Sequence, residues 1–189
     1  MTEKLTKQFG IPTSETEAPL EQGEKEHESV EVRFDAKTGT LLLGLGGKER
    51  LDPQFLEDAE SNGFCTKDEL HMTVIGFKQG KQLMKAIKQY PELADKIATL
   101  AGETEWGIQP TGERYNLTKQ YEGEDTPRQS IIEMVACPGG ESFIGQLNTL
   151  TGLQLEEQPP HVTLATQGNP QGIGINTGQD IIDLGQRMA

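Results

Sequence analysis

Hydrophobic and polar residues alternate in two short segments of this chain, and the two segments share one pattern. Residues 71–74 read HMTV and residues 161–164 read HVTL, so each is His, apolar, Thr, apolar. Successive side chains of a β-strand point to opposite faces. Each segment is therefore predicted to be a strand that turns its His and Thr to one face and anchors its apolar residues in a core.

An internal repeat surrounds these two strands. A short apolar run starts 31 residues before each histidine, at residue 40 in the first half and at residue 130 in the second. Between run and motif, residues 52–59 and residues 141–150 each predict a helix. Strand, helix and motif strand thus occur twice in the same order, offset by 90 residues.

Spacing and turn residues predict the other elements. Asp52 and Pro53 suit the N-cap and the first position of the first helix. The glycine-rich segment 168–178 is expected to form a turn, and its place directly after the second motif also allows it to rim the site. The remaining elements are a helical stretch at 81–101 that Pro91 divides, an antiparallel strand pair at 106–120 and 129–137, and a last helix at 179–185.

The first 31 residues differ in composition from the rest. They contain eight Glu and three Lys, with few apolar side chains. Such a segment cannot bury enough apolar surface to offset the entropy lost on ordering. Residues 1–31 are therefore expected to be an acidic flexible tail, and residues 32–189 the folded domain.

Charge narrows the range of partners. The chain has 17 Lys and Arg against 30 Asp and Glu, a net charge of −13, of which the tail accounts for −5 and the domain for −8. A protein that follows an extended nucleic-acid tract needs clustered Lys and Arg, so no such tract is expected as a partner. A small nucleotide or a short RNA end fits an acidic domain better. No apolar run is long enough to span a membrane and the opening residues are polar, so a cytoplasmic protein without membrane association is expected.

The two motifs carry groups for acid–base chemistry. His71 and His161 have an ordinary pKa near 6.5, which lets one imidazole accept a proton while the other donates one. Thr73 and Thr163 add a hydroxyl beside each imidazole. Four such groups on a common face suit chemistry on an oxyanion such as a phosphate.

A metal site is the less favoured interpretation of the same histidines. A zinc site can be drawn from them together with Cys65 and Cys137, but the close Cys-x-x-Cys spacing of such sites is absent. No metal ligand set and no cofactor are expected.

Paired His-x-Thr motifs with matching upstream patterns resemble the two-histidine phosphoesterase superfamily, the LigT-like proteins. The resemblance covers about residues 39–169. It implies an α+β fold of two pseudo-symmetric antiparallel sheets with outer helices and a cleft between two lobes, at about 38–101 and 104–189. It also implies that His71 and His161 are the acid–base pair and that Thr73 and Thr163 hold the phosphate oxygens, without metal or cofactor.

The function that follows is hydrolysis of a cyclic 2′,3′ or 2′-linked phosphodiester in a nucleotide or an RNA end. Within the family, 2′–5′ RNA ligation and cleavage of a cyclic oligonucleotide remain alternatives, and a non-catalytic nucleotide-binding module is a third. Tyr115 is a candidate for stacking on a base. The residues leave open which histidine is the acid, and they leave the oligomeric state open.

Overall fold

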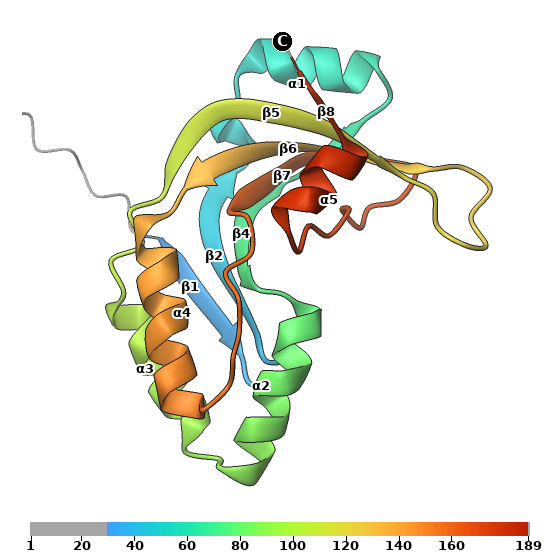
Figure 1. Ribbon diagram of the computed structural model, residues 1–189. Helices are drawn as coiled ribbons and strands as arrows, with labels where there is room; N and C mark the ends of the chain where they lie inside the picture. Colours follow the sequence, from blue (N-terminus) through green and yellow to red (C-terminus); the bar gives the residue numbers. More distant parts are fainter. Residues whose placement is uncertain (1–29, 189) are drawn as a thin grey trace, which may run out of the picture.

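The computed structural model describes residues 30–188, and within this range one eight-stranded, mostly antiparallel sheet is surrounded by five α-helices (Figure 1). The strands are β1 Glu31–Asp35, β2 Thr40–Gly47, β3 Cys65–Thr66, β4 Glu69–Ile75, β5 Gln109–Lys119, β6 Arg128–Ala136, β7 His161–Gln167 and β8 Gly185–Arg187. The helices are α1 Pro53–Ser61, α2 Phe77–Gln89, α3 Leu93–Glu103, α4 Pro138–Thr151 and α5 Gly178–Leu184, and a 3-10 turn covers Lys48–Arg50. The α+β class is confirmed.

The predicted acidic tail falls almost entirely outside the described residues. Only Val30 and Glu31 of that segment belong to the described range, and Glu31 is the first residue of β1. Strand β1 was not predicted from the sequence. Its alternating Val32 and Phe34 pack against the main core, while Glu31 and Arg33 face the other way.

In place of the two separate sheets in two lobes that the resemblance implies, the structure has one continuous sheet, and the described residues show no division into two lobes. The strand order is β1-β2-β4-β7-β6-β5-β8, with β3 attached to β7. The two motif strands, β4 and β7, pair with each other where Met72 lies opposite Val162. Because these two strands exchange backbone hydrogen bonds, they join the halves into a single sheet at its centre.

The internal repeat is present in the strand register. In the first half, Gly44 of β2 lies opposite His71. In the second half, Met134 of β6 lies opposite His161. Met134 follows Gly44 by 90 residues, as His161 follows His71, so each apolar run pairs with its motif strand in the same register. Outward from β4 the next strands are β2 and β1, and outward from β7 they are β6 and β5, so in each half the strand of the apolar run lies next to the motif strand.

The predicted helices are present, with small differences at their ends. Asp52 is the N-cap of α1, and its carboxylate accepts a hydrogen bond of 2.7 Å from the backbone N–H of Gln54. Pro91 lies in the short break between α2 and α3. The strand pair β5–β6, helix α4 and helix α5 occupy the remaining predicted segments.

One large core lies on the face of the sheet that carries Met72 and Val162. It includes residues from both halves, among them Ile97 of α3 and Phe143 of α4, both fully buried. Figure 1 shows α3 and α4 side by side. A smaller cluster of Leu117, Ile132, Ile173 and Ile175 covers part of the opposite face in the second half. Among the described residues, no helix is both long enough and apolar enough to cross a bilayer.

Candidate active site

The four motif side chains lie on one face of the two central strands. On β4 and β7 the burial alternates: Met72 and Val162 are only 3% and 4% exposed, whereas the neighbouring His and Thr side chains are partly exposed. In an antiparallel pair, residues directly opposite each other share a face. With Met72 opposite Val162, His71 falls opposite Thr163 and Thr73 falls opposite His161.

The two histidines are therefore diagonal neighbours across the strand pair. Such neighbours are separated by about 7–8 Å between their Cα atoms. The charge of His71 acts on the ring of His161, which agrees with this proximity. Two imidazoles and two hydroxyls thus lie next to one another on one partly exposed face of the strand pair. The sequence predicted that the four motif side chains share one face. The structure shows that the register of β4 against β7 brings them together, and this register cannot be derived from the pattern of either strand alone.

His161 is oriented by the backbone that precedes it. Its Nδ1 lies 2.7 Å from the carbonyl oxygen of Pro159, which can only accept, so Nδ1 carries the proton and donates it. In the neutral ring, Nε2 is then the free acceptor. Burial lowers the pKa of His161 below its ordinary value of 6.5, and the nearby charge of His71 lowers it further, while the bond to Pro159 raises it.

His71 has a more charged environment. Burial lowers its pKa below 6.5, and the charges of Arg33 and Lys67 also lower it. The carboxylate of Glu69, two residues earlier on the same strand face, acts in the opposite direction and raises the pKa. His71 therefore has beside it a carboxylate that favours its protonated form, whereas the charge that acts on His161 is that of His71.

Sequence reasoning missed the charged groups around His71. Arg33 forms an ion pair with Glu69 and lies 3.4 Å from a carboxylate oxygen of Glu31. A pattern search on single strands cannot find these groups, because Arg33 and Glu69 come together only through the pairing of β1, β2 and β4. Alternation along β1, once that strand is known, is the one signal that places Glu31 and Arg33 on this face.

The glycine-rich segment borders the site, as the sequence allowed. A Cβ on Gly172 would lie 3.2 Å from the hydroxyl oxygen of Thr163, so this backbone passes close to the threonine. The Nζ of Lys67 donates a hydrogen bond to the carbonyl oxygen of Pro170 in the same segment. On the other side, a Cβ on Gly76 would contact both the Gln158 amide and the Thr73 methyl group. The segments 168–178 and 153–160 therefore both approach the site threonines.

Tyr115 lies on the same face of the sheet but at a distance from the histidines. It pairs with Ile132, and Ile132 pairs with Thr163, so two strand spacings separate Tyr115 from Thr163. At about 4.8 Å per spacing this is roughly 10 Å. The tyrosine packs against the smaller apolar cluster. Tyr115 is therefore part of the packing of this face and does not lie beside the histidines.

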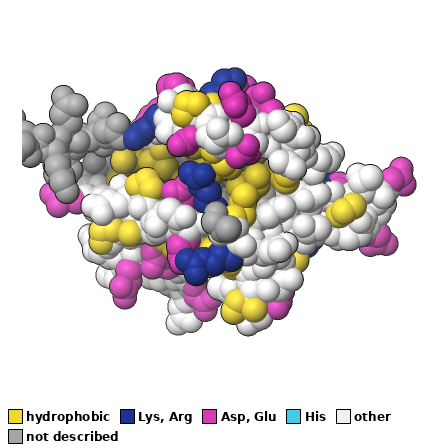
Figure 2. Space-filling view, turned by 90° about the horizontal axis from the view of Figure 1, so that it is seen from above, with side chains coloured by type: hydrophobic (Ala, Val, Ile, Leu, Met, Phe, Trp, Pro, Cys, Tyr) yellow, Lys and Arg dark blue, Asp and Glu magenta, His cyan; other side chains and the backbone are white. Residues whose placement is uncertain are grey.

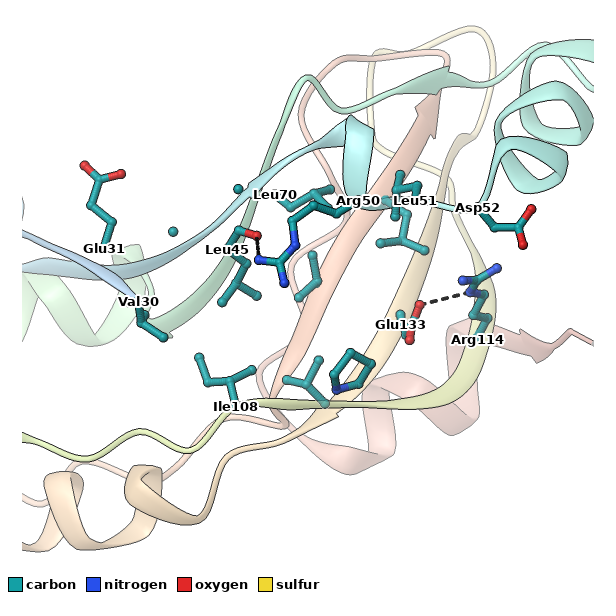
Figure 3. A pocket seen from close by; sticks show the side chains of 16 residues that line it. Val30, Glu31, Leu45, Arg50, Leu51, Asp52, Leu70, Ile108, Arg114 and Glu133 are labelled. Carbon is teal, nitrogen blue, oxygen red and sulfur yellow. Dashed lines mark hydrogen bonds and ion pairs between the residues drawn. The ribbon is translucent and has the colours of Figure 1, made fainter. Parts of the chain in front are cut away.

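A hollow of about 800 Å³ lies on the other face of the sheet (Figure 3). Its walls include Leu70, Val162 and Leu164, which alternate with the motif residues on β4 and β7. The ion pair between Arg114 and Glu133, 3.0 Å from Nε to Oε2, lies at one end. In the view from above, hydrophobic side chains gather around Lys and Arg side chains and no His side chain of the described residues is visible (Figure 2). This hollow is thus separated from the histidines by the sheet.

The sequence-based alternative of a zinc site is not formed. Cys65 is exposed and Cys137 is buried at the start of α4. Within residues 30–188, no three side chains among His, Cys, Asp and Glu come together as a ligand set.

Comparison with known proteins returned no match: no family model, no curated protein and no solved structure is significantly similar to this chain.

Proposed function

We propose that this protein is a phosphodiesterase that hydrolyses a cyclic 2′,3′ or 2′-linked phosphodiester by acid–base catalysis with two histidines. The observation that carries the proposal is the arrangement of His71, Thr73, His161 and Thr163 on one partly exposed face of paired central strands. The repeated register in the two halves supports it, because each half contributes one imidazole and one hydroxyl in an equivalent position.

The surroundings of the two imidazoles favour different roles. His161 is kept neutral by burial, with Nδ1–H held by Pro159, so Nε2 is the general base that takes a proton from water. The pKa of His71 is also lowered, by burial first, but of the two rings His71 is the one with a carboxylate, Glu69, whose charge favours the protonated form, and we therefore assign it the role of general acid. The water oxygen forms a bond to phosphorus, the bond to one ribose oxygen breaks, and that oxygen receives the proton from His71.

The two threonines stabilise the charge that develops on the phosphate. Each hydroxyl donates a hydrogen bond to a nonbridging oxygen, where negative charge increases in the transition state. A base attached to the sugar extends along the sheet, and Tyr115 is our candidate for its stacking partner. The reaction as proposed uses no metal and no cofactor, and a cytoplasmic location stays a prediction from the sequence.

The first experiment measures hydrolysis of the four 2′,3′-cyclic nucleoside monophosphates in the presence of EDTA. We expect turnover by the wild type, and losses of about 10²–10⁴-fold in kcat for His71→Ala and for His161→Ala, the usual contribution of general acid–base catalysis. His27→Ala removes the chain's third histidine and is the matched control. Equal melting temperatures of the variants exclude unfolding as the cause.

Three outcomes contradict the proposal. Loss of activity in EDTA with recovery on adding a divalent ion would assign the reaction to a metal. Full activity of both histidine variants would exclude the acid–base pair. Tight binding of nucleoside 2′- or 3′-monophosphates without turnover of any cyclic or 2′–5′-linked substrate would favour a nucleotide-binding module.

A further inference from the structure

Arg33 is the cation whose position the motifs do not explain. It lies on β1, two strands outside β4, on the face of the motif histidines: Arg33 pairs with Leu42, and Leu42 pairs with Thr73. Its guanidinium extends across β2 toward the site and forms an ion pair with Glu69 of β4. A long side chain on an edge strand thus delivers a positive charge next to the centre of the sheet.

A glycine makes this path possible. Gly44 of β2 lies opposite His71, and a Cβ at Gly44 would lie 2.7 Å from Nη2 of Arg33. The guanidinium therefore rests on the bare backbone of Gly44, one strand away from His71. Neighbouring strands are about 4.8 Å apart, so the cation lies immediately beside the histidine.

The guanidinium keeps most of its hydrogen-bonding capacity. Arginine has five N–H donors. Within residues 30–188, one hydrogen bond from Arg33 is formed, from Nη2 to Glu69. Nε lies 3.4 Å from Glu31, is buried, and makes no hydrogen bond in the described part of the chain, so a ligand can use only the three remaining N–H donors, on Nη1 and Nη2. The side chains of Arg33, Glu69 and Glu31 are 37%, 54% and 70% exposed, and ion pairs of such exposure contribute little to stability. A phosphate can therefore take the place of a carboxylate at the guanidinium when that carboxylate turns out to solvent.

We propose that Arg33 binds a second phosphate group of the substrate, next to the phosphate that reacts. This inference rests on the proposed function. The reacting phosphate is already surrounded by the His and Thr side chains of β4 and β7, whereas Arg33 lies one strand further out, over β2. A guanidinium matches the geometry of a phosphate with two parallel N–H donors. The preferred substrate is therefore a nucleotide with a further phosphate or an oligonucleotide end, rather than a nucleoside cyclic monophosphate.

The test measures binding and so does not depend on turnover. Its probes are adenosine 2′-monophosphate and adenosine 2′,5′-bisphosphate, compared by calorimetry at one salt concentration. We expect the wild type to bind the bisphosphate about tenfold more tightly. Arg33→Gln abolishes this preference and leaves the affinity for the monophosphate nearly unchanged.

Two further variants are used as controls. One changes the position of the Arg33 guanidinium without removing it, and the other removes an arginine elsewhere on the sheet. Gly44→Ala keeps Arg33 but places a Cβ 2.7 Å from Nη2 and 3.2 Å from the Cβ of Glu31, so the guanidinium is displaced and β1 must shift slightly. We expect the preference for the bisphosphate to fall, and an unchanged melting temperature shows that the fold is retained. Arg187→Gln removes an exposed arginine that pairs with Glu113 at the other edge of the sheet, and it leaves the preference intact.

The inference is overturned if the wild type binds both probes equally or binds neither. It is also overturned if Arg33→Gln weakens both probes to the same extent, because Arg33 would then contact the first phosphate. Failure of the proposed function has a different signature, namely unchanged turnover in the histidine variants, and the ratio of the two affinities still reports on Arg33 in that case.

Discussion

At the scale of single residues, two identical imidazoles acquire different properties from their neighbours. Burial lowers the pKa of both, but the bond from Nδ1 to Pro159 fixes the tautomer of His161, and Glu69 partly offsets burial at His71. Because both pKa values lie below 6.5, both rings are mainly neutral at pH 7 in the free protein. One of them must gain a proton before it can act as the acid.

The pH dependence of kcat/KM tests this description. The base must be neutral, so the rate rises with pH up to its pKa; the acid must be protonated, so the rate falls above its pKa. Both pKa values are lowered from 6.5. We therefore expect a bell-shaped profile whose maximum lies below pH 6.5. A maximum above about pH 7 would contradict it, as would a profile without an acidic limb.

At the scale of secondary-structure elements, local signals set where helices begin. Asp52 satisfies the backbone N–H of Gln54 at the start of α1, and Pro53 occupies the first helical position, where no N–H is needed. Thr177 and Asp180 form a reciprocal capping box at the start of α5. The Asp52 and Pro53 signal located α1 to within two residues of its ends, whereas the capping box of α5 was not used in predicting a helix at 179–185.

The N-cap of α1 gives a prediction about stability. Asp52→Ala leaves the N–H of Gln54 without its partner, so we expect the free energy of unfolding to fall by about 1 kcal/mol. Asp52→Ser restores most of the loss, because a serine hydroxyl is an equivalent cap. Urea denaturation of the three proteins measures the difference, and an unchanged midpoint for Asp52→Ala would show that the cap is not stabilising.

At the scale of the whole molecule, the two halves share one core. Ile97 of α3, in the first half, and Phe143 of α4, in the second, both belong to the main core, and the two helices pack against each other. The cluster that contains them also includes Leu41 and Val74 from the first half and Leu164 from the second. The repeated halves are therefore joined both by the β4–β7 pairing and by common side-chain packing.

This shared core predicts a single unfolding transition. Trp106 is the chain's one tryptophan and is only 4% exposed, so its fluorescence reports on the centre of the core. We expect fluorescence and far-ultraviolet circular dichroism to give the same denaturant midpoint, as in a two-state transition. Two separate midpoints would show that the halves unfold independently.

The sequence by itself determined the elements and the chemistry that each motif strand carries. Alternation in HMTV and HVTL fixed which side chains share a face, and Asp52, Pro53 and Pro91 fixed helix boundaries, because these effects act over a few residues of the chain. The 90-residue offset also indicated that the two halves are built alike. Strand β1 was missed because Glu31 and Arg33 interrupt its apolar residues directly after an acidic segment.

Only the tertiary structure decided how these elements meet. The pairing of Met72 with Val162 merged two expected sheets into one and set the diagonal arrangement of the histidines. The approach of Arg33 to His71 across Gly44 likewise depends on the register of three strands. Such contacts join residues that are distant in sequence, and strand register is selected by the packing of a whole face. No local pattern contains that information.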